Sequence, residues 1–148
     1  MMPIYDSCHH AYKTPFGAVA TGQEVRFHIC LPKLQLDTGP VLKIYRMDDT
    51  EALSIIQMRL TGSDYTGNVY SCEFYPGKAA LLSYYFEFAC GDQILRIKKG
   101  GSGTGIIDDN AQPWQMTVYD SNMQAPSFLQ EGVMYHIFPD RFCNSGAA

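Results

Sequence analysis

The feature that most constrains the fold of this chain is the alternation of apolar and polar residues in short segments bounded by turn residues. Residues 81–90 show it most clearly, because one face of this segment would carry Leu82, Tyr84, Phe86 and Phe88. Side chains on a β-strand point alternately to its two faces, so this pattern predicts a strand with one buried face. Gly91-Asp92 then predicts a tight hairpin to a short strand at 93–97.

Similar segments recur along the chain and predict an all-β fold. The expected strands are 25–31, 41–47, 53–60, 69–75, 81–90, 93–97 and 114–119. Residues 53–60 fit a helix or a strand by period, and the β-branched pair Ile55-Ile56 together with the short length favours a strand. About seven short antiparallel strands at even spacing, joined by turn residues, predict an immunoglobulin-like β-sandwich.

Composition and charge exclude several classes of protein. A chain of 148 residues has room for one domain with a core, and 46% hydrophobic and 13% aromatic residues exclude a disordered chain. The net charge is −4 and no basic run exceeds Lys98-Lys99, which argues against nucleic acid or an anionic membrane as partner. There is no apolar run of membrane-spanning length and no basic-plus-apolar leader. Five scattered cysteines predict free thiols and a reducing, cytoplasmic location: Cys8, Cys30, Cys72, Cys90 and Cys143.

Four motifs suggest chemistry, but each has a simpler interpretation. Cys8-His9-His10 contains zinc-ligand types, yet adjacent histidines on an extended segment point apart and no second cluster follows, so we expect a surface or edge segment. The glycine-rich residues 100–105 lead into no helix, which predicts a flexible surface loop rather than a phosphate loop. The acidic residues 48–51 lack the spacing of a calcium loop. His28 falls on the polar side of its strand and is expected to be exposed. We expect no catalytic residue, metal site or cofactor here.

Residues 133–138 form a continuous apolar run that ends at Pro139. Such a run suits a strand buried on both faces of a parallel sheet, which requires neighbouring strands and helical crossovers. Only ten residues follow Phe138, so we expect this to be the first strand of a domain whose other strands lie outside the sequence. An exposed apolar strand edge templates pairing, and we therefore expect residues 133–138 to extend a sheet.

Two motifs carry a family resemblance. Residues 133–142 resemble the Tyr-Gln-Ile-Phe-Pro-Asp-Arg-Phe opening of the catalytic barrel in the α-amylase superfamily of glycoside hydrolases, in its neopullulanase, cyclomaltodextrinase and amylopullulanase branch. Residues 115–120 resemble the Gln-Leu-Thr-Val-Tyr-Asp that precedes this barrel in amylopullulanase-like enzymes. The hairpin at 84–93 is similar to one in the sandwich modules of the family. His136 stands where Gln is usual, and Ser127 where Asp is usual.

The resemblance implies a domain organisation and places catalysis outside this chain. It implies an N-terminal immunoglobulin-like β-sandwich at 1–122, a linker at 123–131 and, at 132–148, the start of a truncated (β/α)8 barrel. In this family, retaining hydrolysis of α-glucans uses two carboxylates on later barrel strands, so this piece is not expected to hydrolyse anything. Asp140 occupies a structural position in the family. Asn144 lies where some relatives carry a calcium ligand, so calcium is possible in the parent enzyme.

Binding is the function that remains for the sandwich. Sugar rings stack their CH faces on exposed aromatic side chains, so contact with α-glucan or maltooligosaccharide is expected at exposed aromatics, although each of these could instead fill the sandwich rim. The candidates are Trp114, Tyr45, Tyr65 and Tyr75. The alternatives are a subunit-interaction module that packs against its own barrel or that of a homodimer partner, and a spacer that binds no sugar.

Overall fold

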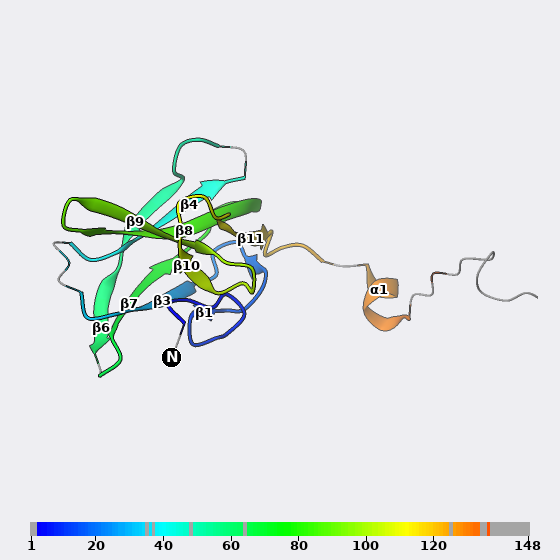
Figure 1. Cartoon of the computed structure of the whole chain (residues 1–148). Coiled ribbons are helices and arrows are strands. Elements are labelled where there is room, and N and C mark those ends of the chain that lie inside the picture. The colour runs from blue at the N-terminus through cyan, green and yellow to red at the C-terminus, as the bar shows by residue number, and fades with distance from the viewer. Residues whose placement is uncertain are drawn as a thin grey trace, which may run out of the picture.

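The computed structural model describes residues 3–34, 36, 38–47, 49–63, 65–124, 126–133 and 136. Its regular structure is almost entirely β and forms two sheets, as Figure 1 shows. The all-β, two-sheet architecture predicted from the alternation is therefore confirmed.

The smaller sheet has four antiparallel strands in the order β1-β3-β7-β6. These strands are β1 (Lys13–Thr14), β3 (Val25–Leu31), β7 (Asn68–Phe74) and β6 (Arg59–Ser63). The bounds of β3 match the prediction, because its alternation of buried and open positions is uninterrupted.

The larger sheet is organised around the long strand β8 (Ala80–Cys90). On one edge β8 pairs with β4 (Val41–Arg46), which pairs in turn with β5 (Ser54–Gln57). On the other edge, one half of β8 pairs with β9 (Gln93–Lys99) and the other half with β11 (Trp114–Tyr119). Two short strands complete the sheet, β10 (Gly105–Ile107) beside β9 and β2 (Val19–Ala20) parallel to β11.

The core lies between the sheets and consists of alternate residues of the longest strands. The fully or almost fully buried side chains include Phe27, Ile29, Leu31, Leu42, Ile44, Tyr84, Phe86, Ile97 and Trp114. Burial of this apolar surface is the main favourable contribution to folding.

The segment 53–60 is not one strand, which corrects the prediction. β5 belongs to the larger sheet and β6 to the smaller one, and the chain crosses between them at Met58. Met58 is 2% exposed and its amide donates to the Pro40 carbonyl. This crossing leaves Ile55 and Leu60 exposed, at 61% and 57%. Strands of two or three residues, such as β1, β2 and β10, are too short to show a period in the sequence.

The N-terminal segment and the glycine-rich loop are more integrated than expected. Tyr5 is wholly buried, and its carbonyl accepts a hydrogen bond from the Gly105 amide at 2.7 Å. Gly103 is also buried, with a φ of 85° that side-chain-bearing residues rarely adopt. Its carbonyl accepts hydrogen bonds from the Trp114 indole and from the Ser7 hydroxyl. The expectation of a purely surface loop at 100–105 is therefore wrong.

Among the described residues after β11, Ser127–Glu131 form the short helix α1, within the predicted linker. Figure 1 shows it apart from the two sheets. The predicted barrel strand at 133–138 and its pairing lie outside the described residues, apart from Val133 and His136, which are exposed and not in a strand. Asp140 and Asn144 are likewise outside them. No helix in the described part of the chain is long and apolar enough to span a membrane.

Candidate functional site

Two tyrosines stack on the outer face of the larger sheet. Tyr45 follows the buried Ile44 on β4, and Tyr85 lies between the buried Tyr84 and Phe86 on β8, so both side chains point away from the core. Their ring centroids are 5.7 Å apart with an interplanar angle of 10°, and their hydroxyl oxygens are 3.1 Å apart. Partial burial, and then the hydrogen bond with Tyr45, raise the pKa of Tyr85. The stacking and the hydrogen bond make the pair a fixed aromatic platform.

A network of charges holds one side of this platform. The Glu87 carboxylate accepts a hydrogen bond from Arg96 Nε at 3.0 Å and forms an ion pair with Lys43, whose Nζ lies 2.8 Å from the other carboxylate oxygen. Arg96 Nη1 also lies 3.2 Å from an Asp109 oxygen. Lys98 Nζ lies over the Tyr85 ring, 5.5 Å from its centroid, which allows a cation–π interaction. The contact with Lys98 and the hydrogen bond with Tyr45 restrict the motion of the Tyr85 ring.

Removing the charge of Glu87 should destabilise the sheet measurably. Glu87 is only 9% exposed, and Glu87→Gln would leave Lys43 and Arg96 close together without their carboxylate. Because both cations are partly solvated, we expect a loss of about 1–2 kcal/mol in urea unfolding rather than the full cost of a buried broken pair. Glu73→Gln is the control, since Glu73 is exposed on β7. An equal loss in both variants would contradict a specific role for the network.

A hollow of about 330 Å³ lies beside the platform. It forms near the place where the edge of β8 changes its partner from β9 to β11. Ser83 pairs with Tyr45 on one side and with Gln115 on the other, which places the hollow next to the aromatic pair. The residues that line it are Met47, Ser83, Lys99, Gln112, Pro113 and Gln115. The hollow thus offers a hydroxyl group, two amides and an ammonium group close to an aromatic surface; we call the platform and the hollow together the outer-face site.

The four candidate aromatic residues differ in burial and in the sheet that they belong to or flank. Trp114 is 2% exposed, so the expectation that it is an exposed platform is wrong. Its side chain shares the inward face of β11 with Met116 and Val118, stacks on Tyr84 with centroids 5.7 Å apart, and donates its indole N–H to the Gly103 carbonyl at 2.9 Å. With these contacts the ring offers no open face to a ligand.

Tyr65 and Tyr75 are exposed, at 95% and 58%, but they lie before and after β7 in the other sheet. They therefore do not join Tyr45 in one site. The partner of Tyr45 is Tyr85, which the sequence reasoning missed. The available signal was its position in 81–90, on the face opposite the apolar residues.

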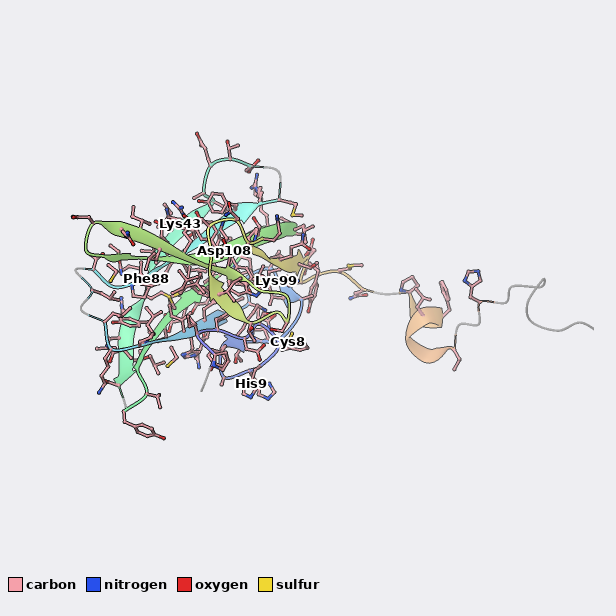
Figure 2. The ribbon with its side chains drawn as sticks, viewed as in Figure 1. Cys8, His9, Lys43, Phe88, Lys99 and Asp108 are labelled. Carbon is pink, nitrogen blue, oxygen red and sulfur yellow. The ribbon has the colours of Figure 1, made fainter. Side chains whose placement is uncertain are left out.

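Two of the described histidines and one cysteine, His9, His28 and Cys30, line a separate hollow of about 310 Å³ near the N-terminal segment. Cys8 and His9 are exposed, and Figure 2 places them on the opposite side of the molecule from Lys43. His28 is half-buried rather than exposed, and burial followed by the nearby Arg26 charge lowers its pKa. Among the residues that the structure describes, no group of three or more metal-ligating side chains could hold a metal ion.

The fold places the chain among all-β proteins with two packed sheets. The solved structure of a cyclomaltodextrinase is similar in fold, with a TM-score of 0.59 and 14% identity, over 90% of this chain and 22% of that chain. No protein-family model matches the chain.

The sequence is similar to three amylopullulanases. It is 28% identical over 160 residues to that of Thermoanaerobacter thermohydrosulfuricus, 29% over 151 residues to that of Thermoanaerobacterium thermosulfurigenes and 28% over 155 residues to that of Thermoanaerobacterium saccharolyticum. The matches cover 97%, 95% and 95% of this chain, but only 10%, 8% and 12% of those enzymes. The resemblance to α-amylase-superfamily enzymes is confirmed, and the chain spans about a tenth of the length of these relatives.

Proposed function

We propose that this chain is a non-catalytic, immunoglobulin-like N-terminal module of a larger α-glucan-hydrolysing enzyme, and that it contacts α-glucan or maltooligosaccharide. The observation that carries this proposal is the coverage of the comparisons: almost the whole chain aligns, but with about a tenth of each amylopullulanase. The catalytic carboxylates, and any calcium, are assigned to the rest of the enzyme.

The outer-face site is the surface proposed for sugar contact. Glucose units present apolar CH faces edged by hydroxyl groups, which suit an aromatic surface flanked by hydrogen-bonding side chains. The paired rings of Tyr45 and Tyr85 supply the first element, and the amides of Gln112 and Gln115 the second. Because the two rings hold each other in place, binding would order few further side chains.

We expect Tyr45→Ala to weaken binding to soluble starch or β-cyclodextrin about tenfold, equivalent to about 1.4 kcal/mol. The change removes one ring of the platform and the hydrogen bond to Tyr85. The measurement is retardation of the protein in native gels that contain a graded concentration of the glucan.

Tyr65→Ala is the matched control, because Tyr65 is more exposed than Tyr45 but lies in the connection between β6 and β7. Its retardation should equal that of the unmodified chain. Equal losses for Tyr45→Ala and Tyr65→Ala would rule out the outer-face site. Absence of retardation at every glucan concentration would rule out sugar contact altogether.

A subunit-contact or spacer role is the second candidate. It is favoured by the exposed apolar side chains around the crossing from β5 to β6, namely Leu53, Ile55 and Leu60. Exposed apolar surface of this kind is typical of interaction sites. If the subunit-contact role holds, Ile55→Ser in the full-length enzyme should shift a dimer to monomer in analytical ultracentrifugation and leave glucan retardation of the module unchanged; a spacer predicts no change in either measurement.

A further inference from the structure

Lys13 is a buried cation on the short strand β1. Its side chain is 3% exposed, and its Cα partner across the sheet is Phe27, which is wholly buried. Directly paired residues of antiparallel strands point to the same face, so the stem of Lys13 enters the space between the two sheets. The ammonium group donates hydrogen bonds to the Pro15 carbonyl at 2.9 Å and to the Gly17 carbonyl at 3.0 Å.

This buried ammonium group has no carboxylate partner within the described ranges. The ion pairs found there involve other cations, namely Arg26, Lys43 and Arg96. Two backbone carbonyls satisfy two of its three N–H donors, and neither carbonyl carries a full negative charge. Burial lowers the pKa of Lys13 to about 8, because transfer out of water disfavours the charged form.

Lys13 lines a hollow of about 310 Å³. The hollow lies between the N-terminal segment and the stretch of β11 that precedes its pairing with β2. Its polar or titratable lining side chains, besides Lys13, are Ser7, Cys8, Tyr84, Gln115 and Thr117. No carboxylate is among the described residues that line it, and Lys13 is the single cation there. Its volume suits a small molecule or ion.

We propose that this hollow is a binding site for a small oxyanion, a carboxylate or phosphate group, with Lys13 as its counter-charge. The attraction between opposite charges is several times stronger at a partly buried site than in water. The third ammonium N–H, which neither the Pro15 nor the Gly17 carbonyl accepts, is the donor for the oxyanion. Gln115 borders both this hollow and the hollow of the outer-face site, whereas Lys13 lines this one alone.

Binding of an oxyanion at this site is linked to the protonation of Lys13. An oxyanion that binds the ammonium form must raise the pKa of Lys13, and its affinity must fall as the pH rises above the pKa of the unliganded protein. Cys8 and Tyr84 are the other titratable groups on the hollow, and neither can become a cation. Burial raises the pKa of Tyr84, so that phenol stays neutral through this range. A thiolate at Cys8 would also weaken oxyanion binding as the pH rises, so the assignment to Lys13 requires that the lysine itself be observed.

The test is a pH titration of the lysine side chains by NMR in the intact chain, with sodium phosphate, sodium acetate or sodium chloride at equal ionic strength. We expect the pKa of Lys13 to rise by about one unit in phosphate or acetate relative to chloride, which corresponds to tenfold tighter binding to the charged form. A larger rise in phosphate than in acetate would assign the site to phosphate groups, and the reverse would assign it to carboxylates.

Lys13→Met keeps the apolar stem and removes the charge, so it should abolish saturable oxyanion binding in calorimetry. Lys33→Met is the control, since Lys33 is exposed and does not line this hollow, and it should bind like the unmodified chain. The proposal is overturned if the pKa of Lys13 is the same in all three salts, or if Lys13→Met binds as the control does. If Lys13→Met does not fold, the titration of the unmodified chain decides.

Discussion

Trp114→Ala is expected to lower the free energy of unfolding by about 3–5 kcal/mol, the range found when a large buried aromatic side chain is truncated. The indole is 2% exposed and packs against the rings of Tyr5, Tyr84 and Phe86. The variant also removes the hydrogen bond to the Gly103 carbonyl, which would remain buried without this donor. Urea denaturation followed by circular dichroism measures the change.

The control for this prediction lies on the same strand. Tyr119 is 42% exposed at the end of β11, so Tyr119→Ala removes a ring of comparable size that is much less buried. It should cost about 1 kcal/mol or less. Similar losses in the two variants would show that Trp114 is not a core residue. Because the Trp114 ring is buried, it cannot contact a glucan directly. Any loss of glucan binding in Trp114→Ala must therefore be compared with the fraction of the variant that is folded.

Tyr5→Ala should be nearly as destabilising, with a loss of about 3 kcal/mol, although Tyr5 is close to the N-terminus. Its ring is wholly buried against Tyr84, Phe86 and Trp114, and its hydroxyl lies 2.8 Å from the Tyr84 hydroxyl. Burial raises the pKa of Tyr5, so the group is a neutral hydrogen-bonding partner in the core. Thermal and urea unfolding give the two independent measurements.

Two further variants separate the contributions of Tyr5. Tyr5→Phe keeps the ring and removes the hydroxyl, so it should cost about 1 kcal/mol, the value of one hydrogen bond left unmade. His10→Ala is the control in the same segment, because His10 is exposed, and it should have little effect. If Tyr5→Ala were as mild as His10→Ala, the N-terminal segment would not be part of the core.

The sequence alone was sufficient to predict most of the long strands. β3 and β11 have the predicted bounds, and the starts or ends of β4, β7 and β8 differ by one residue. The alternation of apolar and polar residues is a local property of a strand. Any strand with one buried face requires it, regardless of which strands are its neighbours. The resemblance to amylopullulanase-like enzymes was equally accessible, because it rests on short contiguous motifs.

The long-range features could not be obtained in this way. Alternation grouped Trp114 with Met116 and Val118 but left open whether that group faces the core, and only the packing of the second sheet placed it inside. Tyr45 and Tyr85 are forty positions apart, and they meet because β4 and β8 pair in one particular register.

No periodic pattern in the sequence indicates the burial of Tyr5 and Lys13 or the change of sheet at Met58. Each depends on contacts between segments that are distant in the chain. Local alternation therefore determined which residues of the chain become strands and which side chains share a face. Register and sheet packing, which depend on the free energy of the whole assembled core, determined which face is buried and which side chains form the two candidate sites.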